Sequence, residues 1–91
     1  MAVIAVWLKI DEGRVPDQMH EAAQQLDYAD GEVLLDFASV RRLDSNALRA
    51  LEEFGDIAQH ESVKVVLRDV SVDVYKVLKL VKVAKRFSFV N

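Results

Sequence analysis

The stretch from Glu32 to Leu51 reads EVLLDFASVRRLDSNALRAL. Its first part, Val33 to Phe37, is a short apolar run of the kind found in strands buried within a sheet. Its second part begins with Asp44 and Ser45, two residue types that favour helix N-termini. Apolar residues at helical spacing follow this pair: Ala47, Leu48, Leu51, Phe54, Ile57 and Ala58. We therefore predict a strand, a loop and a helix that ends near His60.

The residues before this stretch predict another strand and helix. The segment from Ala2 to Ile10 is rich in Val, Ile and Trp, and it stops at a polar run that contains glycine. Pro16 is tolerated in a first helical turn, and the apolar residues around it share one helix face: Val15, Met19, Ala22, Ala23 and Leu26. Asp30 and Gly31 then form a turn that leads into the next strand.

The residues after this stretch continue the alternation. The segment from Val63 to Leu67 predicts a strand, and Ser71 caps a helix whose apolar face holds Val74, Val77, Leu78 and Val81. The alternating segment from Phe87 to Val90 predicts a last short strand. This order predicts a single α/β domain over residues 1–91, with an about four-stranded, largely parallel or mixed sheet and three crossover helices.

The composition restricts the class of protein. The chain has 91 residues and is 52% hydrophobic, which is enough for one core. No stretch approaches the roughly 18 uninterrupted apolar residues of a membrane span, so we expect a soluble, cytoplasmic protein that does not insert into a membrane. The chain has no cysteine, and His20 and His60 lie on different predicted helices, so we expect neither a metal site nor another cofactor. No motif of an enzyme is present, and we predict a protein without catalytic activity.

The charge is unevenly distributed along the chain. The net charge is -3, but residues 1–61 carry 13 acids against 5 bases, whereas residues 62–91 carry 2 acids against 7 bases. Lys76, Lys79 and Lys82 recur every three residues between apolar positions, a pattern typical of the solvated face of a helix. We favour this interpretation over a nucleic-acid interface.

The strand that ends in Asp36 and the later Asp-Ser pair resemble the central signature of STAS domains, in which a hydrophobic strand ending in Asp leads to Asp-Ser/Thr-x-Gly-Leu. The similarity extends in order over nearly the whole chain, from Val6 to Leu80. The sequence departs from the family at three places. Ala47 stands where the family usually has glycine, Lys82 stands where many members have it, and the usual glycine between the second helix and the third strand is missing around His60 to Ser62.

The resemblance implies a protein-binding switch similar to anti-sigma factor antagonists, with Ser45 at the position of their phosphorylation site. The implied partners are an anti-sigma factor serine kinase and a phosphatase. A phosphate is tolerated at a helix N-terminus, where backbone N–H groups lack partners. The residues expected at the partner surface are Arg41, Arg42, Asp44, Ser45, Asn46, Ala47 and Arg49, with Asp36 in a supporting structural role. In the simplest interpretation, Asp44 and Ser45 only cap the helix and the two arginines are only solvated.

Two other functions remain open. The chain is also similar to the constitutive STAS subunit of lipid-transport ABC complexes, which docks on the ATPase. In that case Ser45 contributes only packing or a polar contact. The third hypothesis is a sensory module for a nucleotide or another small ligand, although no residue specifies that ligand.

Overall fold

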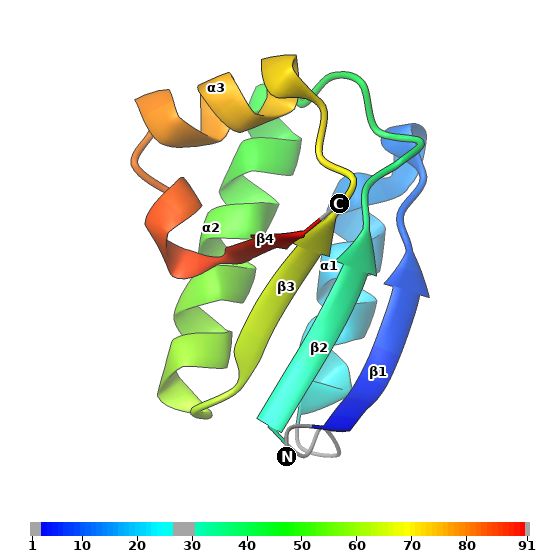
Figure 1. Ribbon diagram of the computed structural model, residues 1–91, viewed down its shortest axis with the longest axis vertical. Coiled ribbons are helices and arrows are strands. Elements are labelled where there is room, and N and C mark those ends of the chain that lie inside the picture. The colour runs from blue at the N-terminus through cyan, green and yellow to red at the C-terminus, as the bar shows by residue number, and fades with distance from the viewer. Residues whose placement is uncertain (1–2, 27–30, 91) are drawn as a thin grey trace.

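The computed structural model describes residues 3–26 and 31–90, and its strands and helices alternate along the chain (Figure 1). The elements are β1 (Val3–Lys9), α1 (Val15–Gln24), β2 (Gly31–Asp36), α2 (Ser45–His60), β3 (Lys64–Arg68), α3 (Val72–Leu80) and β4 (Ser88–Val90). The predicted order of elements is confirmed. Ala2, in the predicted first strand, and Asp30, in the predicted turn, lie outside the described residues.

The four strands form one sheet in the order β1-β2-β3-β4. Each neighbouring pair is parallel, and Val33 of β2 lies opposite Val6 on one side and Val65 on the other. The prediction allowed a mixed sheet, whereas the described sheet is parallel throughout. Because parallel strands end at the same edge of a sheet, the loops that follow β1, β2 and β3 gather there, at the top of Figure 1.

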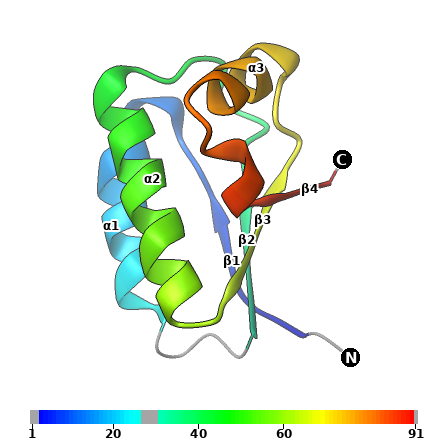
Figure 2. The ribbon, with the colours of Figure 1, turned by 90° about the vertical axis from the view of Figure 1, so that its left-hand side faces the viewer.

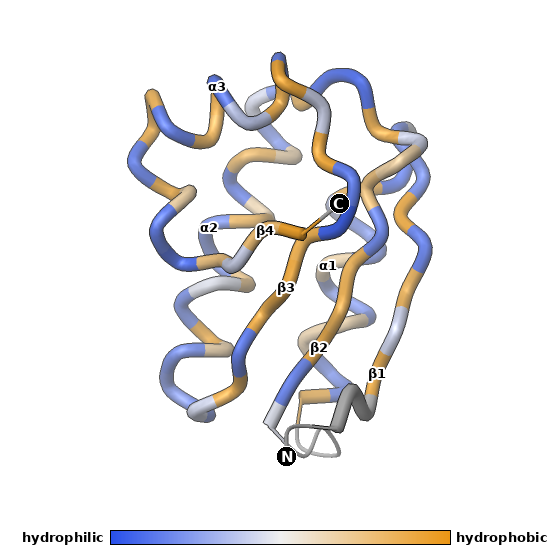
Figure 3. The backbone as a smooth tube through the Cα atoms, in the orientation of Figure 1, coloured by the Kyte–Doolittle hydropathy of each residue, from blue (hydrophilic) through white to orange (hydrophobic). Residues whose placement is uncertain are grey.

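The core includes the buried residues between the sheet and the helices α1 and α2, and it also contains Val74 and Leu78 of α3. Figure 2 shows α1 and α2 on the same face of the sheet. Val33, Leu35 and Phe37 are fully buried in this core, and Figure 3 shows mostly hydrophobic residues along β2 and β3. In β1, Trp7 is 59% exposed. Its two neighbours in sequence face the core: Val6 is buried in it, and Leu8 packs against it. Alternate strand residues thus face the helices and the opposite side.

Two short 3-10 helices that were not expected from the sequence connect main elements of the described residues. They are η1 (Glu12–Arg14) after β1 and η3 (Ala84–Arg86) before β4. The η3 segment packs on α2, where Arg86 forms an ion pair with Asp56. Gly55 permits this close approach, because a Cβ atom at that position would lie 3.1 Å from Cδ of Arg86.

The ends of α2 and α3 share one cap geometry, the Schellman motif. At the end of α2, the N–H of Val63 donates to the carbonyl of Ala58 at 2.9 Å, and Ser62 has a φ of 57°. At the end of α3, Lys82 has a φ of 61° in the same position of the motif. Glycine normally occupies this left-handed position because it has no Cβ atom. The structure therefore explains two places where the sequence departs from the STAS pattern: the left-handed turns are kept without glycine.

Candidate functional site

The loop between β2 and α2 is anchored at its start by β2 and β3. The N–H of Phe37 donates to the carbonyl of Arg68 at 2.8 Å, and the Asp36 carboxylate accepts the N–H of Ala38 at 2.9 Å. Val40 is 1% exposed, so its side chain holds the middle of the loop in the core. The loop consequently leaves the carboxyl edge of the sheet along a fixed path.

The next residues of this loop are held by the turn that follows β1. Oε1 of Glu12 accepts the backbone N–H of Arg41 at 2.7 Å and that of Arg42 at 2.8 Å. Both hydrogen bonds have a carboxylate acceptor and are of the stronger, charge-assisted kind. They bring together two loops that are about thirty residues apart in sequence.

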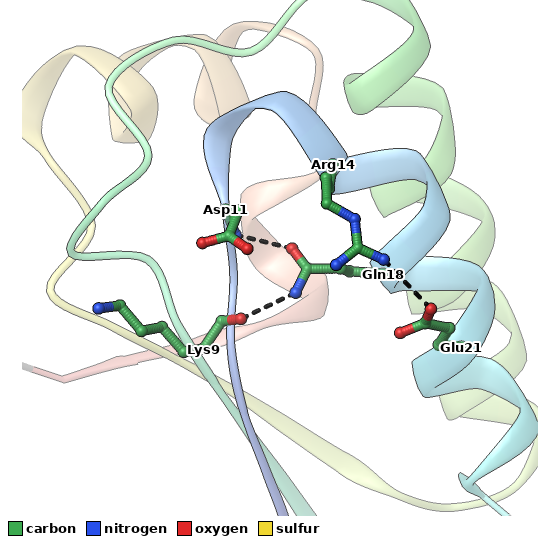
Figure 4. A network of polar contacts seen from close by, with 5 residues as sticks. All are labelled: Lys9, Asp11, Arg14, Gln18 and Glu21. Atoms are coloured by element: carbon green, nitrogen blue, oxygen red, sulfur yellow. Dashed lines mark hydrogen bonds and ion pairs between the residues drawn. The ribbon is translucent and has the colours of Figure 1, made fainter.

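The turn that carries Glu12 is itself fastened to α1 (Figure 4). Gln18 is only 8% exposed, and its amide makes two hydrogen bonds to the backbone at the end of β1. Its Oε1 accepts the N–H of Asp11 at 2.7 Å, and its Nε2 donates to the carbonyl of Lys9 at 2.9 Å. Gln18 therefore positions the turn, and the turn positions the loop before α2.

Asp44 is the N-cap of α2. Its Oδ1 accepts the N–H of Ala47 at 2.8 Å, and its own backbone is extended, as at most N-caps. Ser45 is the first helical residue, and it is exposed. Asp44 thus caps the helix with its side chain, whereas Ser45 is an exposed residue of the first turn.

The other residues expected at the partner surface occupy three surroundings. Asn46 and Arg49 are exposed and line a pocket of about 360 Å³ between α1 and α2. Arg41 and Arg42 are also exposed, and they line a pocket of about 280 Å³ against α3. Ala47 is 4% exposed, so its methyl group packs in the core and not at the surface. The first turn of α2 therefore lies between two pockets, each of which is lined in part by arginine.

Within residues 3–26 and 31–90, no group of three His, Asp or Glu side chains is placed to hold a metal ion. His20 lies 3.3 Å from Nε2 of Gln24, and His60 lies 3.1 Å from the carbonyl of Asp56, each within its own helix. In the same part of the chain, no helix is long and apolar enough to cross a membrane.

Two residues that organise this site, Glu12 and Gln18, were missed by the sequence analysis. Glu12 lies in a polar run that predicted only a turn, and Gln18 lies on a helix face predicted from its apolar residues. Their partners are backbone groups, which carry no pattern in the sequence. No signal in one sequence identifies such contacts.

The comparisons with known proteins agree with the fold. A search of curated proteins finds no match. The NMR structure of the protein TM1081 has a similar fold, with a TM-score of 0.77 at 15% sequence identity, over 100% of this chain and 78% of that one. The family model of the STAS domain matches residues 2–91. Since this match covers nearly the whole chain, the protein belongs to the STAS domain family.

Proposed function

We propose that the first turn of α2 docks on a protein partner and that phosphorylation of Ser45 releases this partner. STAS domains are in general regulatory, protein-binding modules without catalytic activity, so the family supports the first part of the proposal. The switch in the second part rests on the chemistry of the α2 N-terminus. The proposed partner is a serine kinase of the type that anti-sigma factor antagonists bind, with a phosphatase that resets the switch.

The observation that carries the proposal is the division of roles between Asp44 and Ser45. Because the cap of the helix is the Asp44 carboxylate, modification of the Ser45 hydroxyl leaves the capping group itself unchanged. Ser45 is also exposed, at the end of a loop that Glu12 holds in place. A kinase can therefore reach this serine, and the loop before it is held by the two Glu12 hydrogen bonds.

A phosphate at this position changes the surface more than the fold. It adds about -1.5 to -2 charges at neutral pH. The positive end of the helix dipole tolerates this charge, and the preceding Arg41 and Arg42 supply further cations in the same loop. A partner pressed against the turn would instead have to desolvate a dianion beside Asp44. Its affinity is therefore expected to fall.

The direct test incubates the purified chain with candidate anti-sigma factor kinases and ATP, and then maps the phosphate by mass spectrometry. Ser45→Ala should abolish phosphorylation and retain binding, whereas Ser45→Glu should weaken binding. Ser39→Ala is a matched control, because Ser39 is exposed in the same loop. Phosphate on Ser39 alone, or equal binding by the chain before and after modification of Ser45, would contradict the proposal.

The same turn would also serve the alternative function, a constitutive subunit that docks on the ATPase of a lipid-transport ABC complex. The supporting observation is that the loop before α2 is already anchored by Val40 and Glu12, as a permanent interface requires. This function predicts a stable complex with the ATPase and no modified serine. Co-purification from the native host, followed by mass spectrometry of Ser45, separates the two functions.

A further inference from the structure

The outward face of α3 combines exposed apolar side chains with lysines. Val72, Lys76, Lys79 and Leu80 are spaced so that they share one face of the helix, opposite the buried Val74 and Leu78. Val72 is 68% exposed and Leu80 is 81% exposed, and both lysines are exposed. We call these four residues the α3 outer face. The lysine spacing alone predicted a solvated helix face, which does not explain the two apolar side chains.

The opposite side of α3 packs against the rest of the protein. Val74 and Leu78 are buried in the core, and Ser71 caps the first turn through the N–H of Val74 at 3.2 Å. Tyr75 packs edge-on against Phe89, with 5.0 Å between the ring centroids. Nζ of Lys79 lies 5.9 Å from the centre of the Tyr75 ring. The α3 outer face is therefore a preformed surface that needs no folding step before it binds.

The charge of the α3 outer face is opposite to that of the other helices. The outward residues of α1 and α2 include the exposed acids Asp17, Glu21, Glu52 and Glu53. In α3 the only acid is Asp73, in the first turn, where it suits the helix dipole. Lys82 and Lys85 follow the helix and add to the positive charge of residues 62–91. An anionic surface would thus be attracted to α3 and repelled by α1 and α2.

The kind of cation distinguishes a lipid surface from a protein partner. The basic residues of α3 are both lysines, which are depleted in protein interfaces, whereas arginine is enriched there. Lysine side chains suit a bilayer surface, because their methylene stems cover apolar atoms while their ammonium groups reach the lipid headgroups.

We propose that the α3 outer face binds the surface of an anionic bilayer, with Leu80 and Val72 entering the headgroup region and Lys76 and Lys79 contacting lipid phosphates. The contact is peripheral and reversible, since so few apolar side chains take part. It is independent of the partner proposed for α2, because it does not involve Ser45.

The proposal is tested by sedimentation of the full chain with two kinds of vesicle, phosphatidylcholine alone and phosphatidylcholine mixed with phosphatidylglycerol. The chain should sediment with the mixed vesicles only, and less as salt is added. Each lysine near an anionic membrane contributes about fivefold to affinity, so Lys76→Gln/Lys79→Gln should weaken binding about twenty-five-fold. Leu80→Ser should weaken it about tenfold, through the loss of buried apolar area.

Matched variants separate a specific face from a general charge effect. Lys9→Gln/Lys64→Gln removes the same charge from exposed strand positions, and Ile57→Ser removes an exposed apolar side chain from α2; both should bind as the original chain does. Equal weakening by these controls would overturn the proposal. So would the absence of binding to mixed vesicles. Binding to soluble polyglutamate but not to mixed vesicles would overturn it in favour of an acidic protein partner.

Discussion

Oε1 of Glu12 accepts the backbone N–H of Arg41 at 2.7 Å, although the two residues are 29 positions apart in sequence. The same oxygen accepts the N–H of Arg42 at 2.8 Å. One carboxylate from the β1–α1 turn thus satisfies two consecutive backbone donors of the β2–α2 loop. The geometry of the proposed docking surface therefore depends on a residue outside that surface.

Removal of this carboxylate should loosen the loop before α2. In Glu12→Ala, the N–H groups of Arg41 and Arg42 lose their acceptor and turn to water, so their amide hydrogen exchange should become faster. Because the site is exposed, the loss in free energy of unfolding should be modest, about 1 kcal/mol. NMR hydrogen exchange and urea unfolding measure the two effects.

Glu52→Ala is the matched control, since Glu52 is an exposed glutamate on α2. It should leave the exchange of both arginine amides unchanged. If the Glu12→Ala variant retains slow exchange at Arg41 and Arg42, Glu12 does not order the loop.

Asp44 and Ser45 should differ in their effect on stability. Asp44→Ala removes the side chain that caps α2, and such a loss typically costs about 1 kcal/mol of folding free energy. Ser45→Ala should change the stability by less than about 0.5 kcal/mol, as for other exposed surface substitutions. Urea unfolding of the two variants measures this difference. Equal losses would show that the Ser45 hydroxyl also stabilises the helix end, and the division of roles would be wrong.

Glycine at the two left-handed cap positions should stabilise the protein. Ser62 and Lys82 adopt φ values of 57° and 61°, which disfavour residues with a Cβ atom by about 1 to 2 kcal/mol. Glycine loses more backbone entropy on folding than other residues do, and this loss offsets part of the stabilisation gained by relieving the strain. Ser62→Gly and Lys82→Gly should therefore each raise the free energy of unfolding by roughly 0.5 to 1 kcal/mol.

Lys79→Gly provides the control for this prediction in thermal unfolding. Lys79 lies inside α3, where glycine should lower the stability by about 1 kcal/mol. A lower melting temperature for Lys82→Gly than for the original chain would mean that the lysine side chain contributes more than the strained backbone costs.

The order of elements could be predicted because each element carries its own local signal. The apolar run of β2 and the Asp-Ser pair at the start of α2 could be recognised without reference to the rest of the chain. The separate capping role of Asp44 could not be predicted, since Asp44 and Ser45 both favour helix N-termini. The burial of Ala47 also needed the structure, because it depends on how α2 is rotated against the sheet.

The contacts that organise the site are of another kind. Glu12 and Gln18 bind backbone groups, and the same residue types are common on solvated surfaces. Their roles depend on which turns the parallel sheet brings to one edge. The sheet topology was itself predicted only as largely parallel or mixed, since alternating strands and helices do not exclude an antiparallel edge strand.

The two hydrogen bonds of the Gln18 amide should stabilise the fold at the base of the site. Gln18→Leu keeps the approximate volume but leaves the Asp11 N–H and the Lys9 carbonyl unpaired, which should cost about 1 to 3 kcal/mol in free energy of unfolding.

Gln18→Glu keeps an acceptor for the N–H of Asp11, but an ionised carboxylate cannot donate to the Lys9 carbonyl. The protonated carboxyl can do both, so folding should raise the pKa of the introduced group above its ordinary value of about 4.3. A group whose pKa is raised by folding stabilises the protein when it is protonated, and this contribution disappears as the pH rises through the folded-state pKa. The stability of Gln18→Glu should therefore approach that of the original chain below about pH 4 and fall behind it near neutral pH. Urea unfolding of both proteins across this range measures the difference. A deficit that stays constant with pH would show that the Lys9 carbonyl does not need the Gln18 donor.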